Sequence, residues 1–220
     1  MNIYFLVEGF TEKKIYPQWL SYLMPGLEQV ERFDEVENRN YYIFTAGGYP
    51  SILEEVKNAA ENINDCGKYS HLVVCLDADE FTVEERKEEV AKTFRGASFE
   101  LKAELVVIVQ NRCFETWFLG NRKVYPRNPQ DERLRDYTKF YNVSEKDPEI
   151  MEKFPGFNRI AQFHGDYLKR MLGEKNIPYT KKNPRGVRES AYVEALQKRI
   201  KDKPGQLETL KTFFSFCESV

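Results

Sequence analysis

The sequence HLVVCLDADE, residues 71–80, places a continuous apolar run directly before two acidic side chains. An unbroken apolar run of this length is typical of a strand that is buried on both faces, as in a parallel sheet. Asp77 and Asp79 alternate with Ala78, so an extended backbone directs both carboxylates to the same side. This stretch therefore predicts a central strand that delivers two acids at its C-terminal end.

Other apolar runs on either side of this stretch have the length of strands and alternate with segments of helical periodicity. The further strands expected cover residues 3–7, 41–46 and 104–109, and the helices cover residues 11–23, 50–63, 82–94 and 113–119. Strands that alternate with helices in this way are typical of a parallel sheet covered on both faces. The sequence therefore predicts an α/β fold with a mostly parallel, Rossmann-like sheet. The last strand, at 104–109, is also expected to be buried on both faces.

The pattern changes after about Tyr125, where prolines divide the chain into short pieces. Helical periodicity returns at residues 157–172, 190–200 and 206–217, with no strand pattern of comparable strength. We therefore expect two parts: an α/β domain at residues 1–124, and a helical extension with a basic segment at residues 125–220.

Composition excludes several classes of protein. No apolar run approaches the length that crosses a bilayer, so no membrane association is expected. The first residues, MNIYFLVEG, lack the basic segment and cleavage site of a signal peptide, which makes the cytoplasm the expected location. The four cysteines show no CxxC spacing and no histidine placed so as to suggest zinc, so neither a zinc site nor a disulfide is expected.

Acidic residues follow two of the predicted strands. Glu8 comes directly after the run at residues 3–7, and Asp77 and Asp79 follow the run at 71–76. In an open parallel sheet, ligands bind beyond the C-terminal ends of the strands. Carboxylate oxygens are the ligands that Mg²⁺ and Mn²⁺ prefer, so these three acids are candidate metal ligands. Each of them alone could equally be an ordinary turn residue.

Basic residues gather near the C-terminus, where residues 180–203 carry eight lysines and arginines against three acids. Lysine and arginine neutralise phosphates, and Gly186 would allow a close approach of a nucleic-acid backbone. Tyr179 and Tyr192 flank the segment and could stack on unpaired bases. A solvated charged loop with core tyrosines is the alternative. The candidate nucleic-acid-binding residues are Lys181, Lys182, Arg185 and Arg188.

Three motifs together resemble the TOPRIM family. VEGFTE (residues 7–12) is similar to the first TOPRIM motif, a strand followed by glutamate and glycine, and LDADE (76–80) is similar to the second, a DxD after a later strand. NRCFETWFLGN (111–121) resembles a segment that follows the last core strand. The likeness covers roughly residues 1–120. It is greatest to stand-alone TOPRIM proteins related to the OLD-family nucleases, including RloB-like proteins and the TOPRIM effector of the PARIS anti-phage system.

The resemblance implies a nuclease that depends on Mg²⁺ or Mn²⁺ and cleaves DNA or RNA, tRNA included. Glu8 would be a metal ligand or general base, Asp77 and Asp79 metal ligands, and Glu115 a ligand of a second metal. It also implies an effector of antiviral defence that works with an ABC/OLD-type ATPase partner. The sequence departs from many relatives after the second motif, where Glu80 and Phe81 replace a small residue. Glu80 could enlarge the acidic cluster or point to solvent.

Two other functions stay open. A nucleic-acid-binding or adaptor protein could keep the fold and the motifs without catalysis. A receiver-like signalling domain also uses carboxylates at strand ends together with magnesium, although the glutamate and glycine after the first strand fit it poorly. A homodimer formed through the C-terminal helices is a further possibility that the sequence does not decide.

Overall fold

The computed structural model describes residues 1–95 and 100–220. The strands are β1 (Asn2–Val7), β2 (Glu28–Gln29), β3 (Asn40–Thr45), β4 (His71–Asp77) and β5 (Glu104–Gln110). The α-helices are α1 (Phe10–Leu23), α2 (Ser51–Cys66), α3 (Val83–Phe94), α4 (Phe114–Leu119), α5 (Glu132–Phe140), α6 (Ile160–Gly173), α7 (Ser190–Asp202) and α8 (Glu208–Ser219). Short 3₁₀ turns lie at Phe33–Glu35, Pro148–Ile150 and Arg185–Val187.

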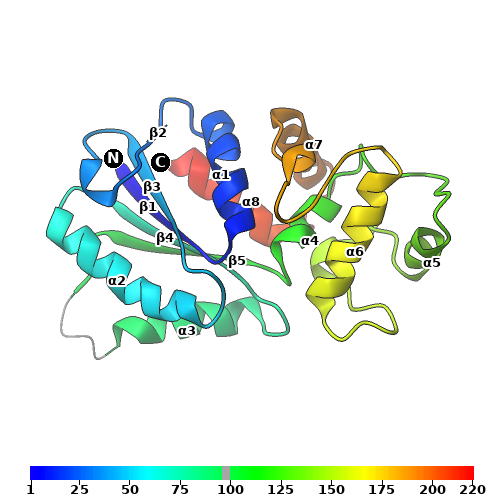
Figure 1. Cartoon of the computed structure of the whole chain (residues 1–220), viewed down its shortest axis with the longest axis horizontal. Coiled ribbons are helices and arrows are strands. Elements are labelled where there is room, and N and C mark those ends of the chain that lie inside the picture. Colours follow the sequence, from blue (N-terminus) through cyan, green and yellow to red (C-terminus); the bar gives the residue numbers. More distant parts are fainter. Residues whose placement is uncertain (96–99) are drawn as a thin grey trace. The chain divides into compact units, whose positions relative to one another are not determined.

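The five strands form one parallel sheet in the order β2-β3-β1-β4-β5 (Figure 1). β1 occupies the centre, because Val7 pairs with Thr45 on one side and with Cys75 on the other. The parallel arrangement follows from the helices that connect the strands, since each connection carries the chain back to the same end of the sheet. The predicted α/β class and mostly parallel sheet are confirmed.

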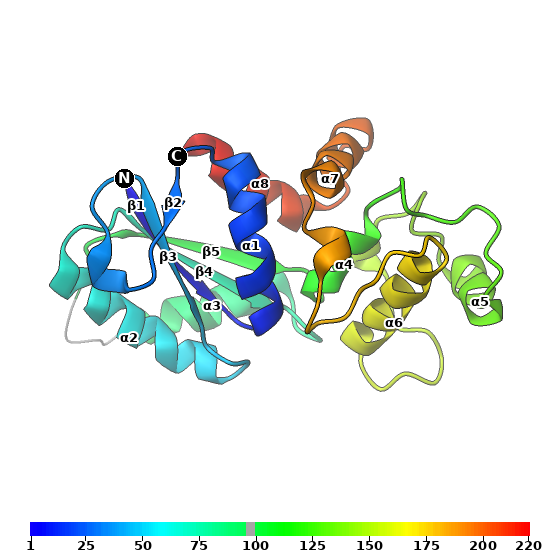
Figure 2. The ribbon, with the colours of Figure 1, turned by 45° about the horizontal axis from the view of Figure 1, so that its top comes forward.

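Helices cover both faces of the sheet, as Figures 1 and 2 show. Alternate residues of β1 point to opposite faces, because side chains on a strand repeat every two residues. On one face, the ring of Phe5 lies 6.3 Å from that of Tyr16 in α1 and 6.4 Å from that of Phe216 in α8. On the other face, Tyr4 contacts Tyr69, which follows α2, at 5.6 Å. The central strand is fully buried in consequence.

The edges of the sheet differ from expectation. β5 is an edge strand, and its residues Leu105, Val106 and Val107 are only half-buried. The prediction that this strand is buried on both faces was therefore wrong for its first half, because its apolar content did not reveal its position in the sheet. β2 and α5 were not predicted from the sequence. β2 has two residues, too few to show a pattern, and α5 is rich in charged residues.

The chain divides into two compact units. Unit 1 comprises Met1–Leu76, Thr82–Val109 and Phe214–Val220, and contains most of the sheet. Unit 2 comprises Asp77–Phe81 and Gln110–Phe213. This division differs from the expected boundary after residue 124, because the chain enters unit 2 at Gln110 and its last residues return to unit 1. Unit 2 is helical apart from the strand ends that enter it, as expected for the C-terminal extension.

Unit 2 has its own aromatic core around α6. Phe163 of α6 contacts the rings of Tyr137, Phe154 and Phe157 at centroid distances between 5.1 and 5.9 Å. Ring contacts of this kind add to the free energy that burial of apolar area provides. α6 thereby holds in place both α5 and the loop that precedes α6. No helix in the described ranges is long and apolar enough to cross a bilayer.

Candidate functional site

Glu8 is the first residue after β1 and is partly exposed. Its backbone N–H donates to the carbonyl of Cys75 at 3.0 Å, which continues the β1–β4 pairing by one residue. Gly9 then begins α1, and a Cβ atom at this position would lie 3.0 Å from Oε2 of Glu12. Gly9 therefore leaves room for the buried Glu12 carboxylate. Glu12 lies in the first turn of α1, where a negative charge stabilises the helix N-terminus.

The segment Asp77–Phe81 belongs to unit 2 and is held by backbone hydrogen bonds. The N–H of Ala78 donates to the carbonyl of Gln110 at 2.9 Å, and that of Asp79 donates to the carbonyl of Arg112 at 2.7 Å. Asp79 has a left-handed backbone with φ of 52°, a conformation that aspartate tolerates better than most residues. The turn thus leaves extended geometry at Asp79. The simple expectation that Asp77 and Asp79 share one side of an extended strand was therefore wrong.

Glu80 has a role different from the two expected from the sequence, which were to enlarge the acidic cluster or to point to solvent. Its carboxylate accepts a hydrogen bond from the backbone N–H of Ile160 at 2.8 Å. Ile160 is the first residue of α6, and Arg159, which precedes it, provides no side-chain cap. Glu80 therefore caps α6 across a long sequence separation, and its negative charge lies where the helix dipole favours it. The structure assigns Glu80 a structural task in unit 2.

Glu115 lies in α4 and is almost completely buried, with 1% of its surface exposed. Its Oε1 atom accepts a hydrogen bond from the hydroxyl of Tyr179 at 3.0 Å and lies 3.3 Å from Nζ of Lys181. Its Oε2 atom is buried and has no hydrogen-bond partner among the described residues. A buried carboxylate needs a compensating charge, and Lys181 supplies it. Glu115 and Lys181 were both predicted site residues, but their pairing was not predicted.

Asp77 belongs to the same electrostatic group. Partial desolvation of its ammonium lowers the pKa of Lys181, but the negative charges of Glu115 and Asp77 outweigh this effect and raise the pKa above its ordinary value. Burial, with the charges of Glu115 and Asp77, also raises the pKa of the Cys113 thiol. Lys181 therefore remains protonated, and Cys113 remains a neutral thiol near these charges. Unit 2 thus brings together Asp77, Glu115 and Lys181.

The residues fit a divalent metal in the kind of donor they offer, since carboxylate oxygens suit Mg²⁺ and Mn²⁺. Their placement is less favourable. Among the residues that the structure describes, no three His, Cys, Asp or Glu side chains form a group that could hold a metal ion. At Glu115, a second metal would compete with the ammonium group of Lys181 for the carboxylate. A metal at this carboxylate would require Lys181 to move away.

The four basic side chains at residues 181–188 lie in different environments. Lys181 turns to Glu115, whereas Lys182 and Arg185 are exposed and Arg188 is half-buried. Gly186 permits a close approach, but within the protein: a Cβ atom there would collide with Cγ2 of Ile177. Packing within the protein therefore accounts for a glycine at this position without any nucleic acid.

The tyrosines that flank this segment are core residues. Tyr179 and Tyr192 both pack edge-on against Phe118 at centroid distances of 6.1 Å. The hydroxyl of Tyr192 donates to the carbonyl of Phe118 at 2.8 Å. Both tyrosines are buried, so neither has a free face for a base. The alternative interpretation, core tyrosines beside a charged loop, is confirmed for these two side chains.

Two buried titratable groups lie in the core of unit 2. His164 in α6 donates from Nε2 to the carbonyl of Met151 (2.9 Å), which leaves Nδ1 to accept from the Thr116 hydroxyl (2.8 Å). Burial lowers the pKa of His164 to about 4, so the ring is neutral at pH 7. Burial raises the pKa of Glu149 to about 7, although its carboxylate accepts hydrogen bonds from the N–H and hydroxyl of Thr209 at the start of α8.

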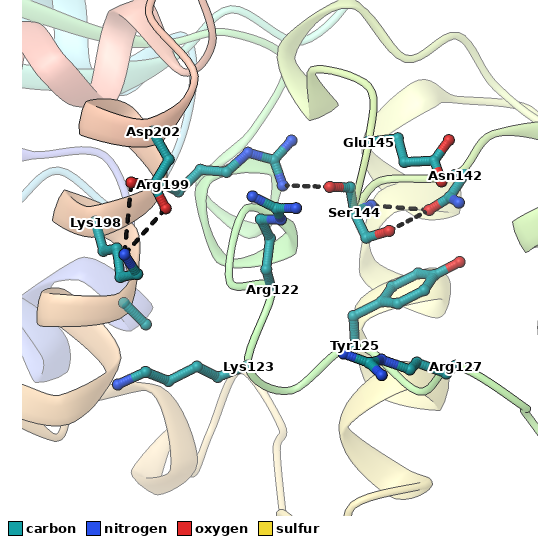
Figure 3. Close-up of a pocket in the computed structure, with 11 residues that line it drawn as sticks. Arg122, Lys123, Tyr125, Arg127, Asn142, Ser144, Glu145, Lys198, Arg199 and Asp202 are labelled. Atoms are coloured by element: carbon teal, nitrogen blue, oxygen red, sulfur yellow. Dashed lines mark hydrogen bonds and ion pairs between the residues drawn. The ribbon is translucent and has the colours of Figure 1, made fainter.

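Unit 2 contains a basic pocket that was not predicted from the sequence (Figure 3). It has a volume of about 560 Å³ and lies between the segment after α4, the loop after α5, and α7. A signal was present in the sequence, because residues 122–127 hold three basic residues around one tyrosine. The residues that line it are Arg122, Lys123, Tyr125, Arg127, Asn142, Ser144, Glu145, Ala195, Lys198, Arg199 and Asp202.

The chain was compared with protein-family models, with curated proteins and with solved structures. None of the three comparisons finds a match. The TOPRIM resemblance therefore stays a prediction that rests on the three motifs at residues 7–12, 76–80 and 111–121.

Proposed function

We propose that this protein is a metal-dependent phosphodiesterase that cleaves DNA or RNA, with a TOPRIM-type arrangement of acids. The proposal includes a role as an effector of antiviral defence together with an ATPase partner, which follows from the motif resemblance alone. The observation that supports the chemistry is the placement of acids at the C-terminal ends of neighbouring parallel strands.

That placement follows from the register of the sheet. Val7 pairs with Cys75, so β1 and β4 end at the same edge. Glu8 is the residue after β1, and Asp77 is the last residue of β4. The C-terminal edge of a parallel sheet is where α/β proteins bind their ligands. Acids that end two adjacent central strands therefore occupy the part of the fold that is best suited to a phosphodiester and a cation.

The motif resemblance would make Glu8, Asp77 and Asp79 ligands of a divalent ion, although no such group is assembled among the described residues. When bound, such an ion would activate water and neutralise charge on the phosphate. Glu8 would also be suited to accept the proton of the attacking water, because it is partly exposed. Lys181 contributes a positive charge next to Asp77 and Glu115, which offsets part of the negative charge that these two acids would present to a phosphate.

A second function has support from one observation. The ion pair between Glu115 and Lys181 neutralises an acid of the group without any metal. A protein that binds nucleic acid but does not cleave it would need no metal ion at these acids, because the ion pair already neutralises one of them. The non-catalytic adaptor therefore remains the alternative, and metal-dependent turnover distinguishes the two functions.

The experiment is an incubation of the purified protein with plasmid DNA, single-stranded DNA and total tRNA, in Mg²⁺, in Mn²⁺ and in EDTA. We expect cleavage of one substrate class in metal and none in EDTA. Asp77→Asn removes one negative charge with little change in shape and should abolish cleavage. Glu84→Gln is the matched control, because Glu84 is an exposed acid on α3 that forms no ion pair or hydrogen bond within the described residues.

Metal binding is measured separately by calorimetry with Mn²⁺. We expect the wild type and Glu84→Gln to bind, and Asp77→Asn to bind more weakly. Cleavage that persists in Asp77→Asn would contradict the assignment of this acid. Nucleic-acid binding without turnover, in every metal and with the ATPase partner present, would favour the adaptor.

A further inference from the structure

The basic pocket of unit 2 contains a buried arginine that forms no ion pair within the described residues. Arg199 of α7 is 1% exposed, and its guanidinium donates to the carbonyls of Val143 (2.8 Å) and Lys146 (2.9 Å). It also donates twice to Oε1 of Gln206, at 2.7 and 3.0 Å. These acceptors are neutral, and within the described residues Arg199 forms no ion pair. The side chain is well satisfied in hydrogen bonds, and the negative charge of Asp147 compensates its positive charge only in part, since the pKa of Arg199 is lowered overall.

A second guanidinium increases this imbalance. Figure 3 shows Arg122 beside Arg199 in the pocket. Burial and the positive charge of Arg122 together lower the pKa of Arg199 to about 10. The neighbouring positive charges of Arg122 and Arg199 destabilise each other, and a bound anion would relieve the repulsion. The pocket is therefore arranged to attract negative charge.

Three of the basic side chains are available to a ligand. Arg122, Lys123 and Arg127 are exposed, and none of them forms an ion pair in the described part of the chain. Lys198 differs, because its ammonium lies 3.2 Å from the carboxylate of Asp202. The free cations come from one short segment, at residues 122–127, and all three line the same pocket (Figure 3).

The loop after α5 adds Asn142, Ser144 and the acid Glu145 to the lining, and Tyr125 adds an aromatic ring. Asn142 accepts hydrogen bonds at Oδ1 from the N–H and the hydroxyl of Ser144, which fixes the turn. Tyr125 is half-buried and lies between Arg127 and these residues (Figure 3). Aromatic side chains beside a basic groove are the usual means by which proteins hold unpaired bases. The volume of about 560 Å³ is in the range of pockets that accept a nucleotide-sized group.

We propose that this pocket binds a single-stranded nucleic acid, with phosphates on Arg122, Lys123 and Arg127 and one base against Tyr125. The proposal rests on the proposed function in taking a nucleic-acid strand as the ligand. It assigns strand binding to this pocket and not to the segment at residues 181–188. A free nucleotide shares the same chemistry, so the experiment must separate a nucleotide from a strand.

The experiment measures fluorescence anisotropy of a labelled oligonucleotide of about 12 nucleotides, a length within the range of single-strand sites. It uses the full chain in EDTA, so that metal binding and cleavage do not affect the result. The test variant is Arg122→Gln with Arg127→Gln. The matched control is Arg133→Gln with Lys139→Gln, which removes the same charge from exposed positions of α5 that form no ion pair within the described residues.

We expect the test variant to weaken binding by about tenfold or more and to reduce the slope of log Kd against log salt by about 1.4, since each phosphate contact with a single strand contributes about 0.7. The control should bind like the wild type. Tyr125→Leu should weaken binding by about tenfold, which is the typical effect of losing one stacked base. Tyr125→Phe keeps the ring and should bind like the wild type.

Three results would overturn the proposal. Equal loss in the test and control variants would show general attraction to a basic surface. A mononucleotide that competes as tightly as the strand would show a small-molecule site, and inorganic phosphate that competes equally would show an anion site without recognition of a base. Strand binding that depends on Arg122 and Arg127 supports the proposal even when no cleavage is found. The proposed function and this inference can therefore fail separately.

Discussion

Lys181 places its ammonium group 3.3 Å from the buried carboxylate of Glu115, across 66 positions of sequence. The lysine side chain is 67% exposed, whereas the glutamate is almost fully buried. The pair therefore joins the loop after α6 to α4, and it compensates a charge that the fold removes from water. This contact also explains why the basic segment does not act as one surface.

The first prediction concerns this pair. Lys181→Met should destabilise the fold by about 1–2 kcal/mol, because it leaves a buried carboxylate without its counter-charge, while the exposure of the lysine limits the loss. Glu115→Gln combined with Lys181→Met should recover part of that stability, because no buried charge then remains unpaired. Urea unfolding of the wild type, the two single variants and the double variant measures the coupling. Strictly additive effects would show that the pair does not contribute as a unit.

The second prediction concerns His164 and the effect of acid. Its folded pKa of about 4 lies below the ordinary value of 6.5, so the unfolded chain binds a proton first as the pH falls. The free energy of unfolding should therefore lose about 3 kcal/mol from this group between pH 6.5 and 4. His164→Asn should remove that loss. The NMR shifts of the His164 ring give a check that does not depend on the variant: they should remain those of neutral imidazole down to about pH 4, and titration near 6.5 would contradict the buried assignment.

The third prediction concerns Glu149, whose contribution to stability has the opposite pH dependence to that of His164. Its folded pKa of about 7 lies above the ordinary value of 4.5, so the folded state keeps a proton that the unfolded chain has released. This group therefore stabilises the fold below pH 4.5, and about 3 kcal/mol of that stability is lost as the pH rises to 7. Glu149→Gln should remove this loss, so that stability rises more steeply between pH 4.5 and 6.5 than in the wild type. Urea midpoints at several pH values test it, and unchanged pH dependence would be incompatible with the raised pKa.

The fourth prediction concerns Gly186. A methyl group at this position would collide with Ile177, so Gly186→Ala should destabilise the fold by about 1–3 kcal/mol. Gly165→Ala is the control, because Gly165 lies inside α6 and a Cβ atom there meets nothing within 4 Å. That control should be neutral or stabilise by up to about 1 kcal/mol, since alanine favours helices over glycine. Equal effects of the two substitutions in thermal unfolding would contradict the close packing at Gly186.

The sheet could be predicted from the sequence because its central strands are continuous apolar runs. β1, β3 and β4 were found within one residue of their ends, and the helix expected at residues 82–94 is α3, which Thr82 and Glu85 cap. β5 was placed correctly, but its position at the edge of the sheet could not be read from its composition. α5 carries five charged side chains in a short amphipathic stretch, which concealed it.

The candidate site was less predictable, because it depends on contacts between distant residues. Local motifs located Glu8 and Asp77 at strand ends, since a strand and its last residue lie together in the sequence. They could not reveal that Lys181 pairs with Glu115, or that Glu80 caps α6 through Ile160. The basic pocket also depends on contacts between residues that are distant in the sequence. Its lining comes from three separate stretches of chain, and only the fold brings them together.

The measurement that tests the central claim most directly is cleavage of DNA and tRNA by the wild type and by Asp77→Asn, in Mn²⁺ and in EDTA, with Glu84→Gln as control. The proposed function predicts cleavage by the wild type and by Glu84→Gln in metal, and none by Asp77→Asn or in EDTA. Equal cleavage by the wild type and Asp77→Asn, or cleavage that persists in EDTA, would contradict a metal-dependent phosphodiesterase built on the strand-end acids.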